Sequence, residues 1–254
     1  MRWFSPRAFR VWQRNRDVFL ALSRSEVPGI LVEPLLVLFA MGIGLGDYVG
    51  LIDGQDYIEF IAPGVIAGYG MFSAVFECTF GSFVRLDYQK TYDAILTTPL
   101  SMEDVVVGEI LWGATRALIT TAAVLFIAAI FGLIHSYMAL LTLPVGFLAG
   151  LMFASIALSF TAIAPAISSF TYFFTLFITP MFYFSGVFFP PDSFPESIQR
   201  LSWIAPLTPV TEVTRSLVQG KLEASILWSL LLIVAITAVF FYLSLVLMRR
   251  RLLK

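Results

Sequence analysis

Six long apolar stretches constrain this chain more than any other feature of its sequence. Each approaches or exceeds the roughly 20 residues that an α-helix needs to cross the hydrocarbon core of a bilayer. They lie at about residues 27–47, 57–83, 105–132, 138–164, 168–190 and 225–247. Hydrophobic residues make up 59% of the 254 positions and charged residues only 13%, so a water-soluble globule would leave an apolar surface. The sequence therefore predicts an all-α membrane protein with six transmembrane helices.

Basic residues are distributed unequally between the two sides of the expected bundle. With the N-terminus in the cytoplasm, twelve of the 16 Lys and Arg residues fall in cytoplasmic pieces and three in external pieces. Cytoplasmic loops of membrane proteins carry such an excess of Lys and Arg. We therefore expect a multi-pass protein of the bacterial inner membrane with both termini in the cytoplasm, which requires an even number of spans.

The first 26 residues predict an amphipathic helix on the cytoplasmic side, with no cleaved signal peptide. Over residues 4–24, apolar and polar side chains occupy opposite faces of a helical wheel. The apolar face holds Phe4, Ala8, Val11, Val18, Phe19 and Leu22, and the polar face holds Arg7, Arg10, Arg14 and Asp17. We expect this helix to lie at the interface with its arginines toward lipid phosphates. An ordinary soluble surface helix is the alternative interpretation.

The cytoplasmic segment 85–100 predicts a short helix over 85–98. Pro99 ends this helix, because the residue before a proline avoids the helical region. Ser101 and Asp104 then have the spacing of a capping box that opens the third span. The short helix would present one small apolar face, formed by Tyr92, Ile95 and Leu96.

The external segment 190–224 predicts two short amphipathic helices before the last span. Ser193 and Glu196 have capping-box spacing at the start of the first helix. The second helix would have Thr208 as its cap, Pro209 at its first position and Gly220 just past its end. We expect a re-entrant or membrane-surface hairpin here and not a soluble domain.

Charged residues fall inside the predicted spans, among them Glu33, Glu77, Glu109 and Arg116. A lone charge at that depth costs at least about 2.5–3.5 kcal/mol, so pairing is expected. Glu109 and Arg116 are seven residues apart and share a helix face. We expect Arg116 to pair with one or more of the glutamates. Three roles remain open for this charge network: a structural clasp, gating or substrate contact, and a proton relay.

The fifth predicted span is dense in aromatic residues. Phe173, Phe177 and Tyr183 could line a substrate path, and ordinary packing or a lipid-facing surface is the alternative. Several glycine pairs have the spacing that permits close helix contact, either within the chain or between subunits. They include Gly64 with Gly68 and Gly146 with Gly150.

Motifs for catalysis and for cofactor binding are missing from the sequence. No glycine-rich phosphate loop of the form GxxxxGK(S/T) occurs, nor does a zinc-protease or nucleophile-elbow motif. The chain has one cysteine, Cys78, and one histidine, His135, which argues against a disulfide and a metal site. A net charge of −1 argues against nucleic-acid binding. We therefore expect no catalytic site, metal or cofactor in this chain.

Three runs of sequence resemble the type-2 ABC exporter permeases. The first covers 76–83 and continues through Arg85 to 91–100. The second is the run FSGVFFP at 184–190, and the third is PLTPVTEVTRSLVQG at 206–220. The nearest branch is that of nodulation protein J, which exports lipo-oligosaccharide. Pro209 is a departure, since many relatives would carry a histidine there.

This resemblance implies a homodimer that docks two copies of a cytoplasmic ABC ATPase. The ATPase, and not this chain, would bind ATP and Mg²⁺. Membrane lipid would be the other partner, and the substrate would be amphipathic: a lipid-linked saccharide, a lipo-oligosaccharide or a hydrophobic drug. The 85–98 helix would couple to the ATPase through Arg85, Tyr88, Lys90, Thr91, Tyr92, Asp93, Ile95 and Leu96.

Two other function classes compete with an ATP-driven permease. A proton-driven secondary transporter would use Glu77 and Glu109, although such carriers often show paired repeats that this sequence lacks. A membrane scaffold or an intramembrane enzyme is the remaining alternative. The expected organisation is an interface helix at 1–26, one transmembrane domain at 27–248 and a basic cytoplasmic tail at 249–254.

Overall fold

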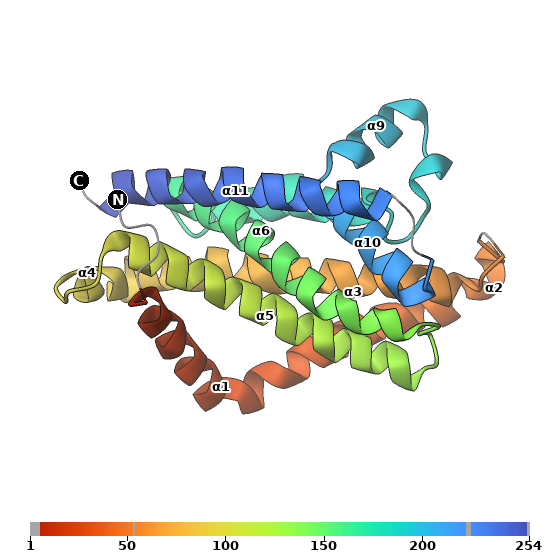
Figure 1. Cartoon of the computed structure of the whole chain (residues 1–254), viewed down its shortest axis with the longest axis horizontal. Coiled ribbons are helices and arrows are strands. Elements are labelled where there is room, and N and C mark those ends of the chain that lie inside the picture. Colours follow the sequence, from red (N-terminus) through yellow and green to blue (C-terminus); the bar gives the residue numbers. More distant parts are fainter. Residues whose placement is uncertain (1–5, 53, 222–224, 253–254) are drawn as a thin grey trace.

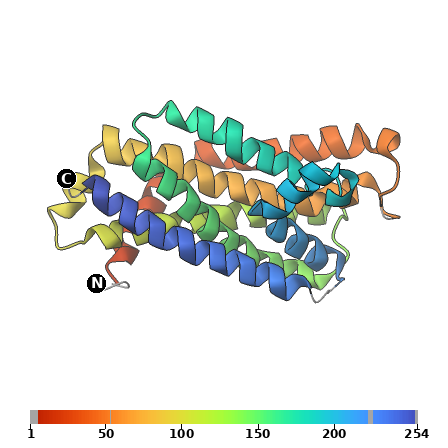
Figure 2. The ribbon, with the colours of Figure 1, turned by 90° about the horizontal axis from the view of Figure 1, so that it is seen from above.

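A computed structural model describes residues 6–52, 54–221 and 225–252 of the chain. The predicted face residue Phe4 and the tail residue Lys254 lie outside these ranges. The described residues form an elongated helical bundle (Figures 1 and 2). Its α-helices are α1 Ala8–Val37, α2 Gly46–Val49, α3 Tyr57–Phe76, α4 Thr91–Leu96, α5 Met102–Ile130, α6 Thr142–Ile163, α7 Ser169–Phe173, α8 Thr179–Phe184, α9 Glu196–Ile204, α10 Leu207–Gln219 and α11 Ser225–Leu252. Wider π-helical turns occupy Leu38–Ile43, Glu77–Gly81, Val84–Tyr88 and Phe174–Ile178, and 3₁₀ turns occupy Tyr137–Leu141 and Pro191–Ser193.

Five helical stretches of the described chain are long and apolar enough to cross a membrane. They are Pro28–Val49, Tyr57–Tyr88, Met102–Ile130, Tyr137–Ile163 and Ser225–Leu252, and each matches a predicted span. The span predicted at 168–190 is shorter in the structure, where the apolar helix covers Ser169–Phe184. The helix stops there because Gly186 adopts a φ of +76°, which a right-handed helix cannot contain. The all-α membrane fold is confirmed.

The N-terminal arm and the first span belong to one helix. α1 runs from Ala8 to Val37 without a break, so the boundary expected after residue 26 falls inside it. Figure 1 shows α1 bending between the two arms. Pro28 lies inside the helix and removes a backbone hydrogen bond, which accounts for a bend in this region.

The buried face of the N-terminal arm differs from the predicted apolar face. Ala8, Val11, Asn15 and Phe19 are buried where the arm packs against α5. Two residues predicted on that face are about half exposed, Val18 at 49% and Leu22 at 51%. The helical wheel does not show which apolar residues contact protein, and the arm packs on α5 along a narrow seam. That seam includes the polar residue Asn15.

The second span is the centre of the bundle. In the most apolar stretch of this span, 78% of the residues are buried inside the protein. The corresponding share is only 17% in the first span and in the last span. Close approach of the chain to α3 explains two of its glycines. A side chain at Gly64 would collide with the backbone of Val187, and one at Gly68 would collide with the ring of Phe182. This glycine pair therefore serves packing within the chain.

The capping predictions had different outcomes at the two connecting segments. Ser101 and Asp104 form the predicted capping box at the start of α5. Ser193 does not cap α9, which begins at Glu196 after Pro195. α10 begins at Leu207, so Thr208 and Pro209 lie inside it, whereas Gly220 ends it as predicted. The corrections share a cause: prolines at 195 and 206 precede these helices and occupy their cap positions.

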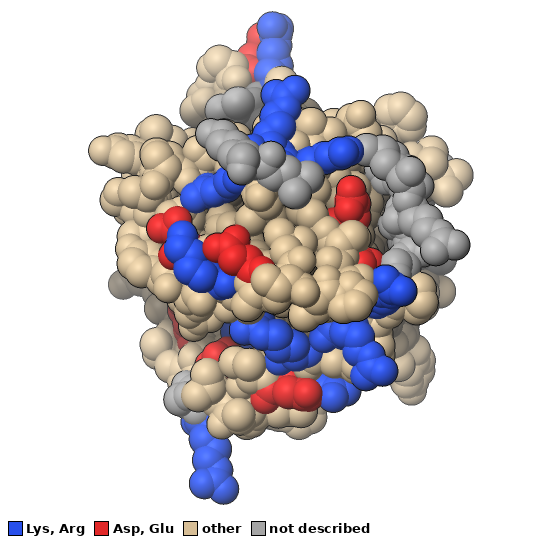
Figure 3. Space-filling view, turned by 90° about the vertical axis from the view of Figure 1, so that its left-hand side faces the viewer, with Lys and Arg blue, Asp and Glu red and all other residues tan. Residues whose placement is uncertain are grey.

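The predicted helix over 85–98 consists of two pieces. Val84–Tyr88 is a π-helical turn that extends the second span, and Thr91–Leu96 forms α4. Lys90 separates them because its backbone is left-handed, with a φ of +51°. Figure 1 shows α4 at the same end of the bundle as the described ends of the chain, and Figure 3 shows Lys and Arg side chains spread over this end.

Candidate functional site

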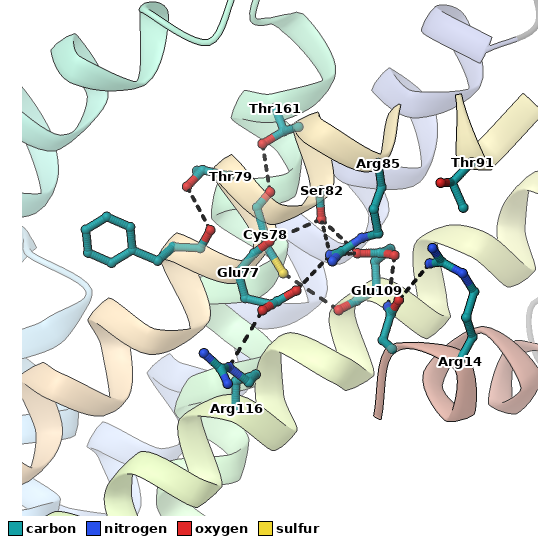
Figure 4. A network of polar contacts seen from close by, with 12 residues as sticks. Arg14, Glu77, Cys78, Thr79, Ser82, Arg85, Thr91, Glu109, Arg116 and Thr161 are labelled. Carbon is teal, nitrogen blue, oxygen red and sulfur yellow. Dashed lines mark hydrogen bonds and ion pairs between the residues drawn. The ribbon is translucent and has the colours of Figure 1, made fainter. Parts of the chain in front are cut away.

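Glu109 is a fully buried carboxylate at the centre of a charge network (Figure 4). It accepts hydrogen bonds from the guanidinium of Arg85 at 2.5 Å, the hydroxyl of Ser82 at 2.8 Å and the amide of Asn15 at 3.0 Å. These donors come from α1 and from the end of the second span, whereas Glu109 lies on α5. A buried carboxylate with three donors is well compensated for its loss of water.

Glu77 joins two arginines in the same network. Arg85 donates to Glu77 over 2.8 Å, and Arg116 forms a longer ion pair with Glu77 at 3.6 Å. Figure 4 shows Glu77 lying between the two arginines. Arg116 also pairs with Glu26 of α1 at 2.6 Å and lies over the ring of Phe19. The network therefore connects α1, the second span and α5.

The structure joins three of the four predicted network residues and leaves one apart. Arg116 pairs with Glu77 as expected but not with Glu109, which pairs with Arg85. Glu33 forms no salt bridge within the described part of the chain, and its residue is exposed. The shared helix face of Glu109 and Arg116 did not determine their partners, because neighbouring helices supply those partners.

Local backbone geometry brings Glu77 and Arg85 together. The two residues are eight apart, so on an ideal α-helix they would differ by about 80° around the axis. The π-helical turns Glu77–Gly81 and Val84–Tyr88 change that rotation and let both side chains reach Glu109 and each other. Such turns occur frequently at functional sites. The hydrophobic pattern of the sequence does not predict these turns.

Three network residues were missed by sequence reasoning: Asn15, Glu26 and Ser82. Asn15 and Glu26 lie on α1, where polar residues are expected at an interface. Asn15 lies four residues from both Val11 and Phe19, so it is a polar residue in an otherwise apolar seam. That position was the signal by which sequence reasoning could have found it. Serine is common in membrane helices, so the sequence gave no signal that Ser82 has a special role.

A cleft of about 900 Å³ lies beside the network, between the first span, the second span, α5 and the α7–α8 segment. Its polar wall includes acidic, basic and hydroxyl groups, and its apolar wall is mainly aromatic. The lining residues are Glu26, Gly29, Ile30, Glu33, Tyr69, Phe72, Ser73, Phe76, Glu77, Phe80, Gly81, Arg116, Thr120, Phe174 and Thr179. A mostly apolar hollow with a few polar groups is typical of a binding site for an organic molecule.

A second hollow of about 410 Å³ lies under the N-terminal arm of α1. Arg14, Asn15 and Arg85 contribute its polar lining. It shares four lining residues with the larger cleft: Glu26, Glu77, Phe80 and Gly81. The charge network therefore lies where the two hollows adjoin, since its members Glu26 and Glu77 line both.

The predicted aromatic path is not assembled in this cleft. Phe173 is 8% exposed and stacks on Phe160 at a centroid distance of 4.4 Å. Phe177 lines a separate hollow of about 160 Å³, and Tyr183 is half exposed outside the cleft. Phe174 of the same segment does line the cleft. An aromatic-dense sequence does not show which of its rings face a cavity.

The residues predicted to couple to an ATPase divide into buried and exposed groups. Tyr92 is completely buried, and burial raises the pKa of its hydroxyl above the usual range, so it stays uncharged. Ile95 and Leu96 pack partly against the core. Arg85 belongs to the charge network, and Thr91 is half buried. The exposed members are Tyr88, Lys90 and Asp93.

Comparison with known proteins identifies the class of the chain. Residues 7–219 match the family model described as ABC-2 type transporter. Nodulation protein J of Sinorhizobium fredii is 36% identical over 243 residues, covering 96% of this chain and 93% of that protein. Nodulation protein J of Rhizobium leguminosarum bv. viciae is also 36% identical, over 96% and 94%. The inner membrane transport permease YadH of Escherichia coli is 24% identical over 78% and 77%. The chain therefore belongs to the ABC-2 type transporter family, as the membrane-spanning permease subunit of an ABC exporter.

Proposed function

We propose that this subunit moves an amphipathic substrate, a lipid-linked saccharide or a hydrophobic drug, outward across the bacterial inner membrane. The cleft of about 900 Å³ carries this proposal, because it offers aromatic walls to an apolar body and charged groups to a polar head. The amphipathic substrate class follows from that combination. Its place between membrane-spanning helices suits a molecule that approaches through the bilayer.

We infer that the working transporter contains two copies of this chain and two copies of a cytoplasmic ABC ATPase. The sequence has no phosphate-binding loop, so ATP and Mg²⁺ would bind on the ATPase. The exposed residues Tyr88, Lys90 and Asp93 beside and within α4 would form the docking surface. Closure of the ATPase pair would push the two α4 regions together and bias the bundle toward its outward-open state.

The charge network would transmit this movement. Arg85 lies only six residues before α4 begins and binds both Glu77 and Glu109. Glu77 lines the large cleft, so a displacement of α4 would reach the cleft wall through one side-chain contact. The saturated hydrogen bonding of Glu109 favours a structural connection over a proton relay, because each donor stabilises the ionised form.

Transport in inverted membrane vesicles tests the proposed function. The chain is expressed with its ATPase, and export of a fluorescent lipid-linked saccharide or drug is followed with ATP or with a proton gradient alone. We expect uptake into inverted vesicles only with ATP, and loss of uptake when the ATPase carries an inactive phosphate-binding loop. Uptake driven by the proton gradient without ATP would contradict the proposal and favour a secondary transporter.

A further inference from the structure

The large cleft has an excess of negative charge. Its lining includes the carboxylates of Glu26, Glu33 and Glu77, against the single guanidinium of Arg116. Arg116 is engaged by Glu26 and Glu77, which leaves Glu33 without a salt bridge among the described residues. Glu33 lies about 8 Å into the first span, where water gives little screening. Tyr69 interacts with Glu33 by a side-chain hydrogen bond but brings no positive charge. A carboxylate at this depth without an ion pair is a candidate functional site.

The apolar side of the cleft is suited to a positive charge as well as to an apolar body. Phe76 stacks on Phe174 with centroids 4.4 Å apart and on Phe80 at 5.7 Å. Tyr69 and Phe72 continue this aromatic wall. Ring faces attract ammonium and other organic cations, most strongly where water is excluded.

A buried hydroxyl in the same wall lacks a partner. Thr120 is 3% exposed and lines the cleft, yet its hydroxyl makes no hydrogen bond within the described chain. Leaving such a group unsatisfied is costly, so a bound molecule with an N–H or O–H group would gain from pairing with it. This observation is independent of the acidic residues and points to a polar-headed occupant.

We propose that the cleft selects an amphipathic organic cation, with its charged head at Glu33 and Thr120 and its apolar body against the aromatic wall. This inference rests on the proposed function only in treating the occupant as the transported substrate. An anionic head would be repelled by the carboxylates, and a neutral body would lose the attraction of Glu33. The selected class includes hydrophobic amines and lipid-linked sugars that carry an amino group.

Two ions of the same shape and opposite charge test the sign of the site. Tetraphenylphosphonium and tetraphenylborate are titrated by calorimetry into the full chain in phosphatidylcholine nanodiscs, with empty nanodiscs subtracted. We expect the cation to bind at least about tenfold more tightly than the anion, and Glu33→Gln to weaken the cation about tenfold. Glu33→Asp should keep most of the preference. Glu196→Gln, whose side chain is 90% exposed on α9, is the matched control and should change nothing.

A primary amine tests the role of Thr120. Octylammonium has N–H groups that tetraphenylphosphonium lacks, so Thr120→Val should weaken octylammonium several-fold and leave tetraphenylphosphonium unchanged. Equal binding of the two tetraphenyl ions, no binding of either, or an unchanged Glu33→Gln variant overturns the cation proposal. An unchanged octylammonium affinity overturns the assignment of Thr120. These binding tests need no ATPase, so their failure is distinct from failure of ATP-driven export.

Discussion

At the scale of single residues, the stability of the bundle depends on how the carboxylate of Glu109 is compensated. Its three hydrogen bonds come from Arg85, Ser82 and Asn15, and only Arg85 brings a positive charge. Removing one partner of a buried pair is more damaging than removing both, because an isolated buried charge remains. The network is therefore a set of linked residues whose variants should not behave additively.

The Arg85→Leu variant should lose about 3–5 kcal/mol of stability, since the buried carboxyl group of Glu109 loses its counter-ion. Adding Glu109→Leu should restore part of that loss. Thermal unfolding in detergent, followed by size-exclusion chromatography, measures both variants. Arg200→Leu is the control, because Arg200 is 83% exposed and forms only a loose surface pair. A double variant less stable than Arg85→Leu alone would contradict this account.

Arg116→Leu should behave differently from Arg85→Leu. Its partner Glu26 is 36% exposed, and Glu77 retains Arg85, so the loss of stability should be smaller. Arg116 lines the large cleft, so the main effect should be on transport. ATP-dependent transport and the unfolding temperature are measured on the same preparation. Full transport activity in this variant would show that the ion pairs of Arg116 are dispensable.

Sequence reasoning identified Glu77, Glu109 and Arg116 because charges are costly inside apolar runs. It could not assign their partners, since pairing depends on how neighbouring helices are rotated. Arg85 was placed in a docking surface, yet the π-helical turn at Val84–Tyr88 directs it into the network. π-helical turns do not produce a regular hydrophobic period in the sequence. The rotation that they cause is therefore visible only in the three-dimensional structure.

At the scale of secondary-structure elements, only one of the two sequence patterns with capping-box spacing caps a helix. The capping box of Ser101 fixes the start of α5, whereas Ser193 makes no such bond at α9. Ser101→Ala should therefore cost about 1 kcal/mol, and Ser193→Ala should be neutral. The difference in unfolding temperature between the two variants measures this directly. Equal effects would mean that the Ser101 bonds add nothing to helix stability.

α4 and the turn before it contain both exposed and buried side chains, and only the exposed ones belong to the proposed docking surface. Tyr88→Ala and Asp93→Lys change exposed side chains and should weaken binding of the ATPase without lowering the unfolding temperature. Tyr92→Ala removes a fully buried ring and should cost roughly 3–5 kcal/mol. Co-purification with the ATPase and thermal unfolding together distinguish the two classes. Normal ATPase binding by both surface variants would exclude this docking surface.

Element types were predicted more reliably than element ends. The lengths of the apolar stretches alone identified five spans. An apolar segment that crosses lipid by itself must be helical, because its backbone groups have to form their hydrogen bonds within the segment. Apolar length overran the end of the Ser169–Phe184 helix, since the residues beyond it are also apolar but follow the left-handed turn at Gly186. Helix starts were misplaced where a proline, as at 195 and 206, took the cap position.

At the scale of the whole molecule, the positions of α4 and of the basic residues bear on how the bundle is oriented in the membrane. α4 and the described chain ends share one end, where basic side chains are spread over the surface (Figure 3). The connection between α5 and α6 lies at the opposite end. The excess of Lys and Arg supports a cytoplasmic position for the α4 end. In the proposed mechanism the ATPase docks at α4, so α4 must lie on the side of the membrane where ATP is present.

The side of the membrane on which α4 lies is the most direct test of this account. In a Cys78→Ala background, Asp93→Cys and Tyr137→Cys each introduce one exposed cysteine, on α4 and on the opposite end. A membrane-impermeant maleimide is applied to intact cells and to inverted vesicles. The account predicts labelling of Tyr137→Cys only in intact cells and of Asp93→Cys only in inverted vesicles. Labelling of Asp93→Cys in intact cells would contradict it.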